Sequence, residues 1–247
     1  MPKLKISIVS YLNSKVFVKG LIPDANAEFD ISLDIPSVCA TKLQNNTIDI
    51  GLIPVAMIPN IPNATIISDY CISATGAVNS VFLLSNSEIK DIHTIYLDVH
   101  SRTSNALCKI LVKEYWNINV EYRNRTEDII SLNTGEAFVL IGDRTFDQIG
   151  KYLTQLDLSE EWFKYTNLPF VFAAWVANKP ITDSELLSFN EYLKNGFNHL
   201  NEVIEENYLD YFDVEDYLKS KIEYNLTEQK HKAINLFLEK LSSTRAN

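Results

Sequence analysis

Polar side chains that could hold a small anion follow apolar segments at several points in the sequence. The first group is Ser10-Tyr11-Leu12-Asn13, which comes directly after the apolar pattern of residues 6–9. A hydroxyl, a phenol and an amide at a strand-to-helix turn predict a turn that faces a ligand. Helix capping by Asn13 explains the same turn, and both roles can hold together because an N-cap side chain faces whatever occupies the helix terminus.

The second group is Ser101-Arg102-Thr103-Ser104, which follows the strand pattern of residues 94–99 and opens a helix pattern over 101–116. Hydroxyl groups, a guanidinium and unpaired backbone N–H groups meet at this point. Such a set favours a carboxylate or phosphate site in which Arg102 binds the anion bidentately. The alternative is plain capping of the helix, with Arg102 directed into solvent.

The third group lies in two turns. Ser80 ends the turn 76–80 and begins a strand pattern, so its hydroxyl can face a cleft, and Gly142 and Asp143 follow the strand pattern of 137–141. Asp143 could orient a hydrogen-bond donor, although capping of the next helix is slightly favoured. Phe170 adds a predicted apolar wall against a ring-shaped ligand.

Alternating short apolar runs and helical patterns predict an α/β protein with mainly parallel strands. Thr182-x-x-Glu185 is typical of a capping box that opens a helix. The order of the segments predicts two lobes, the first formed by 1–86 and 174–247 and the second by 87–173. A ligand cleft is expected between them, since pockets favour domain interfaces and the carboxyl ends of parallel strands. The predicted strands are 6–9, 29–35, 49–53, 65–68, 80–84, 94–99, 120–122, 137–141 and a buried return strand within 168–177.

Composition excludes several classes of function. The 247 residues carry a formal net charge of -10, which argues against nucleic acid and against anionic membrane surfaces as partners. The sequence contains no GxGxxG or Walker loop and no metal-ligand spacing among its His and Cys residues, so no cofactor and no metal are expected. The N-terminal segment has no apolar signal region, which predicts a cytoplasmic protein whose three cysteines are reduced.

Several motifs, taken together and in this order, resemble one enzyme family. They are VSYLNSK near the start, DIPS at 34–37, IDIGLIPV at 48–55, GAVNSVFLLS at 76–85, SRTSNALCKIL at 101–111, LIGD at 140–143 and EEWFKYTNLPFVFAAWVA at 160–177. The chain thereby resembles the chorismate dehydratases of menaquinone biosynthesis by the futalosine pathway. The resemblance extends over about two thirds of the chain.

This resemblance implies a two-lobed fold like that of the type II periplasmic binding proteins, closing over chorismate. The implied reaction removes water from chorismate to give 3-[(1-carboxyvinyl)oxy]benzoate. By the same resemblance Asn13 and Ser80 would lie closest to the reacting ring and act as the catalytic residues. The implied substrate-binding residues are Ser10, Tyr11, Ser101, Arg102, Thr103, Ser104, Gly142, Asp143 and Phe170. No strong base stands in these motifs, so a carboxylate of the substrate itself is expected to serve as the base.

Two departures and three alternatives accompany this interpretation. Relatives often carry Pro soon after the first motif, and Arg-Gly-Pro where this chain has Thr75-Gly76-Ala77. A non-catalytic binding protein for a small carboxylate would share the fold but should be exported. A ligand-binding regulator would need a DNA-binding segment before the first strand. The sister enzyme that forms 1,4-dihydroxy-6-naphthoate is the nearest alternative, but its first strand is expected to end in a Pro/Cys turn. The oligomeric state is left open.

Overall fold

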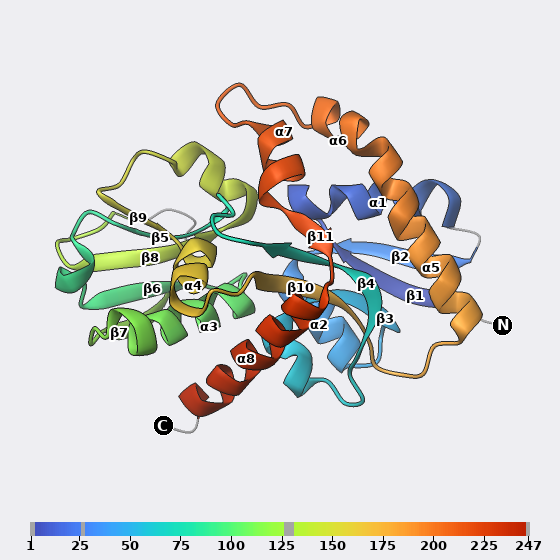
Figure 1. The fold of residues 1–247 in the computed structure, drawn as a ribbon, viewed down its shortest axis with the longest axis horizontal. Helices are drawn as coiled ribbons and strands as arrows, with labels where there is room; N and C mark the ends of the chain where they lie inside the picture. Colours follow the sequence, from blue (N-terminus) through green and yellow to red (C-terminus); the bar gives the residue numbers. More distant parts are fainter. Residues whose placement is uncertain (1–2, 26–27, 126–130, 246–247) are drawn as a thin grey trace. The chain divides into compact units, whose positions relative to one another are not determined.

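The chain forms two compact α/β units. The computed structural model describes residues 3–25, 28–125 and 131–245, traced in Figure 1. Unit 1 consists of Met1–Ser73 with Val171–Thr227, and unit 2 of Ala74–Phe170 with Glu228–Asn247. The α/β class and the two-lobed architecture expected from the sequence are confirmed. The expectation of mainly parallel strands is wrong, because both sheets combine parallel and antiparallel pairs.

A mixed sheet forms the centre of unit 1. Its strands are β1 (Leu4–Val9), β2 (Phe29–Asp34), β3 (Ile50–Pro54), β4 (Thr65–Ala74), β10 (Phe170–Ala177) and β11 (Glu223–Asn225), in the order β11-β4-β10-β3-β1-β2. Strand β1 runs parallel to both β2 and β3, whereas β10 is antiparallel to β3. Ile6, Ile8, Leu52 and Ile53 are fully buried, so the central strands face a core on both sides, as their nearly continuous apolar sequences predict.

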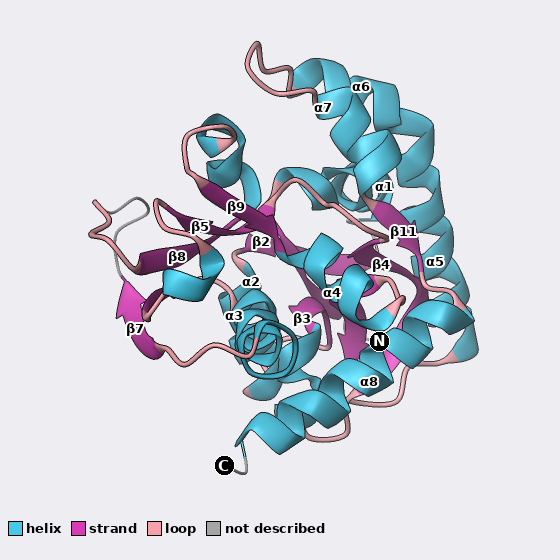
Figure 2. Ribbon diagram, turned by 60° about the vertical axis from the view of Figure 1, so that its left-hand side comes forward, coloured by secondary structure: helices cyan, strands magenta, loops and turns pink. Residues whose placement is uncertain are grey.

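The helices of unit 1 cover the two faces of this sheet. They are α1 (Lys15–Ala25), α2 (Pro36–Gln44), α5 (Asp183–Gly196), α6 (Leu200–Glu206) and the short α7 (Val214–Asp216). The crossovers β1-α1-β2 and β2-α2-β3 run in opposite directions across the sheet. Because such crossovers are right-handed, α1 and α2 lie on opposite faces. Helix α5 begins with the predicted capping box of Thr182 and Glu185 and packs against α1 (Figures 1 and 2).

Two glycines allow α1 and α5 to approach closely. A Cβ atom on Gly20 would lie 2.0 Å from the carbonyl oxygen of Tyr192, and one on Gly196 would lie 2.0 Å from that of Val16. Both separations are far below van der Waals contact. The crossing of these helices, which fixes α1 on the sheet behind the first polar turn, therefore requires glycine on each side.

Unit 2 contains a second mixed sheet with the order β7-β6-β8-β5-β9 (Figure 1). Its strands are β5 (Val81–Ser85), β6 (Thr94–Asp98), β7 (Glu121–Arg125), β8 (Glu136–Ile141) and β9 (Thr154–Asp157). Strand β6 is parallel to β7 and β8, and β5 is antiparallel to β8 and β9. The helices are α3 (Arg102–Leu111), which continues as a π-helical turn to Trp116, then α4 (Leu158–Thr166) and α8 (Glu228–Arg245). Helix α3 packs against α4 and α8 (Figure 2).

The final helix belongs to unit 2, whereas the sequence-based division grouped 174–247 with the first lobe and also placed 74–86 there. The ring of Phe237 on α8 packs edge-on against Phe170, at 5.2 Å between centroids, and against Trp162, at 6.2 Å. Lys240 of the same helix forms an ion pair with Glu114. Helical periodicity identifies the apolar face of α8, but it carries no information on which unit that face packs against.

Candidate functional site

The predicted polar residues of unit 2 gather at one edge of its sheet. The parallel strands β6 and β8 both end at this edge, and the antiparallel strand β5 begins there. The backbone N–H of Gly142 donates to the carbonyl of Ser80 at 2.8 Å, so the two turns lie side by side. The structure therefore brings together Ser80, the Ser101–Ser104 segment and the Gly142-Asp143 turn.

A buried carboxylate holds the turn that presents Ser80. Asp157, which is 5% exposed, accepts backbone N–H groups from Val78 at 2.9 Å and Asn79 at 2.7 Å through one oxygen. Its other oxygen accepts N–H groups from Ser159 and Glu160 and so caps helix α4. No motif in the sequence singled out this residue. Its position just before a helical pattern indicates a cap, but nothing local indicates the contact with residues 78–79.

Replacing Asp157 with Ala is expected to lower the free energy of unfolding by about 3 kcal/mol, from the loss of a helix cap and two buried N–H bonds. Urea unfolding followed by circular dichroism measures this change. Asp213→Ala removes a single exposed cap bond, to the N–H of Asp216, and should cost about 1 kcal/mol or less. Equal losses in the two variants would contradict a special role for Asp157.

The Asp157 carboxyl also predicts a pH dependence. Burial raises its pKa from 3.8 to about 6, and its backbone hydrogen bonds oppose the rise. A folded-state pKa above the unfolded value gives stability that is complete below about pH 4 and is lost as the pH rises through about 6. The stability of the wild type relative to Asp157→Asn should therefore fall by about 3 kcal/mol between pH 4 and pH 7. Urea unfolding of both proteins across this range tests the prediction, and a constant difference would contradict it.

The start of helix α3 combines capping with buried hydroxyls. The Ser101 hydroxyl accepts the N–H of Ser104 at 3.1 Å, which confirms the predicted cap. Ser101, Thr103 and Ser104 are all buried, while Arg102 is exposed. The three hydroxyl groups are therefore buried at this edge of the sheet. Arg102 is on the solvent side, as expected if this segment only caps the helix.

A second arginine, Arg144, which no predicted site included, lies at this edge of the sheet. Asp98, 1% exposed at the end of β6, accepts from Nη2 of Arg144 at 2.7 Å and from Nη2 of Arg125 at 3.2 Å. Arg144 is three residues before Asp147 in the turn that starts at Gly142, and its side chain is 24% exposed. Its place directly after the LIGD motif is a local signal, but its pairing with Asp98 joins positions 46 residues apart. A guanidinium oriented in this way is prepared to bind a carboxylate.

Asp143 and Phe170, two predicted site residues of unit 2, have surroundings that differ from those expected. The helical turn after β8 begins at Gly142, so the exposed Asp143 lies in its first turn and is not its N-cap. Phe170, expected to form an apolar wall for the ligand, is 1% exposed and packs between the rings of Trp162 and Phe237. Its ring thus belongs to the core of unit 2.

The first polar turn lies in unit 1, directly after β1. A 3-10 turn, Leu12–Ser14, precedes α1, and its N-cap position is Tyr11, so Asn13 lies inside the turn rather than capping it. The hydroxyl of Ser14 bonds to the carbonyl groups of Val9 and Tyr11 instead. Within the described part of the chain the half-buried Asn13 amide has no hydrogen-bond partner, and it is therefore available to a ligand.

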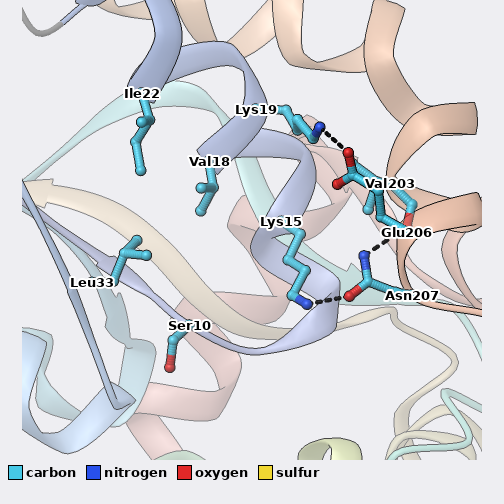
Figure 3. A pocket seen from close by; sticks show the side chains of 9 residues that line it. All are labelled: Ser10, Lys15, Val18, Lys19, Ile22, Leu33, Val203, Glu206 and Asn207. Carbon is cyan, nitrogen blue, oxygen red and sulfur yellow. Dashed lines mark hydrogen bonds and ion pairs between the residues drawn. The ribbon is translucent and has the colours of Figure 1, made fainter.

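A pocket of about 410 Å³ lies next to this turn within unit 1 (Figure 3). Ser10 and Lys15 line it together with side chains of α1, β2 and α6.

Among the residues that the structure describes, no group of three or more His, Cys, Asp or Glu side chains is placed to hold a metal ion. In the same residues no helix is long and apolar enough to cross a membrane.

The fold is shared with periplasmic binding proteins. The periplasmic aliphatic sulphonate binding protein of Escherichia coli superposes with a TM-score of 0.62 at 13% identity, covering 100% of this chain and 94% of that one. A Candida albicans gene product with the generic periplasmic binding protein fold gives 0.60 at 14% identity, covering 100% and 91%. A protein from Archaeoglobus fulgidus gives 0.73 at 15% identity, covering 99% and 98%. The chain thus has the fold of the periplasmic binding proteins.

Residues 4–243 match the family described as Menaquinone biosynthesis, and the chain belongs to that family. A chorismate dehydratase from Thermus thermophilus is 28% identical over 159 residues, which cover 57% of this chain. The matched region spans 58% of the length of that relative. The family expected from the sequence motifs is confirmed.

Proposed function

We propose that this protein is a chorismate dehydratase, a hydro-lyase that converts chorismate into 3-[(1-carboxyvinyl)oxy]benzoate and water for menaquinone biosynthesis. The observation that carries the proposal is the edge of unit 2 where Ser80, the buried hydroxyls of α3 and the guanidinium of Arg144 lie together. Chorismate is a dianion with a ring, and such a set of donors suits a carboxylate. Membership of the menaquinone biosynthesis family and the similarity to a chorismate dehydratase support the same reaction.

The proposed reaction breaks one C–H bond and one C–O bond at two neighbouring ring carbons, leaves the ring intact and needs no external oxidant. The ring carbon that bears the enolpyruvyl ether loses its proton, the neighbouring carbon loses its hydroxyl group, and the two leave as water. The electron pair of the broken C–H bond completes the aromatic ring. The role of the protein is to hold the substrate so that this elimination is aligned.

We assign Asn13 and Ser80 to the reacting part of the ring, where they hydrogen-bond the departing hydroxyl group or the ring carboxylate. The side-chain amide of Asn13 has no hydrogen-bond partner among the described residues, which supports the first assignment. The fixed turn before β5 supports the second, since Asp157 holds its backbone. A carboxylate of the substrate serves as the base. Ser10, Tyr11, Gly142 and Asp143 are assigned to substrate binding. Phe170 is assigned a structural role, because its ring packs in the core of unit 2.

We assign the second substrate carboxylate to Arg144 together with Ser101, Thr103 and Ser104. A guanidinium that a buried carboxylate orients loses less freedom on binding than an exposed one. Arg102 at the solvent side contributes less, because exposed ion pairs are worth about 0–1 kcal/mol.

Arg144→Gln is expected to raise the KM for chorismate about tenfold or more, since a charge-assisted hydrogen bond contributes about 1.5–3 kcal/mol. The value of kcat should change little, because the contact is made in both the ground state and the transition state. Arg102→Gln is the matched control and should change KM less than twofold. Steady-state kinetics of both variants measure the difference, and a larger effect of Arg102→Gln would overturn the assignment.

Incubation of the purified protein with chorismate tests the function itself. An aromatic product that is lighter than chorismate by one water should form, as followed by ultraviolet absorbance and mass spectrometry. Binding without turnover would support a carboxylate-binding protein instead. If chorismate neither binds nor is converted, it is not the substrate of this protein. Location in the cytoplasm is part of the proposal, and recovery of the protein from the membrane or an exported fraction would contradict it.

A further inference from the structure

The pocket beside the first polar turn has an apolar wall open to a ligand. Val18 and Ile22 stand one turn apart on α1, and Leu33 extends from β2 toward them (Figure 3). Strand β2 is the last strand of its sheet, and Leu33 is 49% exposed there. Val203 of α6 closes the wall and is 1% exposed. The volume of about 410 Å³ lies in the range of small-molecule sites.

The two lysines of the pocket differ in their partners. Lys19 pairs with Glu206 at 2.6 Å and with Glu202 at 3.7 Å, and the hydrogen bond that it donates to Glu206 raises the pKa of Lys19. Its charge is thus balanced by carboxylates on α6. Lys15 bonds only to the neutral amide oxygen of Asn207 among the residues that the structure describes. A positive charge without a balancing carboxylate therefore lies at the Lys15 end.

That end of the pocket also has oriented polar groups. The amide of Asn207 donates to the carbonyl of Val203 at 2.7 Å, which turns its oxygen toward Lys15 (Figure 3). Ser10, on the other side of Lys15, is exposed, and its hydroxyl has no partner in the described part of the chain. An ammonium and a hydroxyl at one end of an apolar wall match a carboxylate attached to an apolar body.

We propose that this pocket of unit 1 binds a small organic carboxylate with an apolar ring or chain, its carboxylate on Lys15 and Ser10 and its body against Val18, Ile22 and Leu33. The pocket shares Ser10 with the residues assigned to substrate binding, but the proposal stands without the dehydratase function. Carboxylates of this chemistry have two sources, the substrate or product of the proposed reaction and an unrelated metabolite. Competition between benzoate and chorismate separates the two.

Benzoate serves as the probe, and benzamide as its uncharged counterpart. Titration of the isotope-labelled chain in two-dimensional NMR should shift amide signals of the turn after β1, of α1 and of the end of β2. The expected benzoate Kd is on the order of 1 mM, given the few atoms of the probe. Lys15→Met should weaken binding at least fivefold, and Lys19→Met, on the same helix, less than twofold. Leu33→Asp should abolish binding, and benzamide should bind the wild type at least fivefold more weakly.

Competition with chorismate then identifies the source. Displacement of benzoate by chorismate would assign the pocket to the ligands of the proposed reaction, and unchanged benzoate binding would assign it to a second carboxylate. Both results support carboxylate binding in this pocket, and both can be interpreted even if the chain has no dehydratase activity. Absence of localised shifts in the wild type would overturn it. So would equal benzoate binding by wild type and Lys15→Met, with both shown to be folded by their dispersed spectra.

Discussion

Asn13→Ala and Ser80→Ala are each expected to lower kcat for chorismate dehydration about a hundredfold. Removal of one preorganised hydrogen-bond donor from a developing charge costs roughly a hundredfold or more in rate. The departing hydroxyl group gains negative charge as its bond to the ring breaks. A donor that meets it only at that stage affects kcat more than KM.

The Asn13→Ala variant is the cleaner of the two, because its amide has no hydrogen-bond partner within the described residues. Its thermal unfolding should match that of the wild type. Ser80 is buried, at 2% exposure, so Ser80→Cys serves beside Ser80→Ala as a variant of similar volume. Single-turnover kinetics give the rate of the chemical step. Ser37→Ala on α2, outside the proposed site, is the control for removal of a serine hydroxyl.

Near-normal turnover by both Asn13→Ala and Ser80→Ala would reject their catalytic roles. Loss of turnover on replacing an ionisable residue, with these two dispensable, would instead reject the substrate carboxylate as the base. A bound but unconverted chorismate in the wild type would reject the reaction itself. These three outcomes address the residues, the base and the function separately.

Gly196→Ala is expected to destabilise unit 1 by at least about 3 kcal/mol, in the range of severe overpacking. The same change within an exposed helix usually stabilises a protein by about 0.5–1 kcal/mol. Here the sign reverses, because the new Cβ would lie 2.0 Å from the backbone oxygen of Val16. Backbone on both helices must move to relieve this contact, and α1 cannot stay on the sheet without repacking.

Urea unfolding and amide hydrogen exchange test this expectation. Exchange should accelerate in α1 and α5 before it changes in the sheet of unit 2. Gly150→Ala is the control, since Gly150 has a positive φ of 84° but no atom within 4 Å of the added Cβ. That variant should lose only about 1 kcal/mol from the strained backbone. A Gly196→Ala protein as stable as the wild type would show that the helices do not cross as closely as described.

Local patterns in the sequence determined many of the elements. The apolar runs identified β1, β3, β5, β6 and β8, and the capping signals at Ser101 and Thr182 identified the starts of α3 and α5. The strands β9 (Thr154–Asp157) and β11 (Glu223–Asn225) were missed, and β4 extends to Ala74, well past the predicted 65–68. Short or polar strands of this kind are ordered by their neighbours in the sheet, so their own residues give little signal.

Most of the contacts that position the site residues could be seen only in the tertiary structure. Asp157 meets Asn79 across 78 residues and Arg144 meets Asp98 across 46, and no local pattern encodes either pair. The family and the segments that carry polar side chains could be predicted from the sequence, because a strand end or a helix cap depends on a few neighbouring residues. Packing between distant segments decided which arginine is oriented by a buried carboxylate and which helices α8 packs against. It also decided which pocket lysine has no carboxylate partner among the residues that the structure describes. The hydrophobic effect favours burial of an apolar face but does not specify which distant segment buries it, so these partners are determined only in the folded chain.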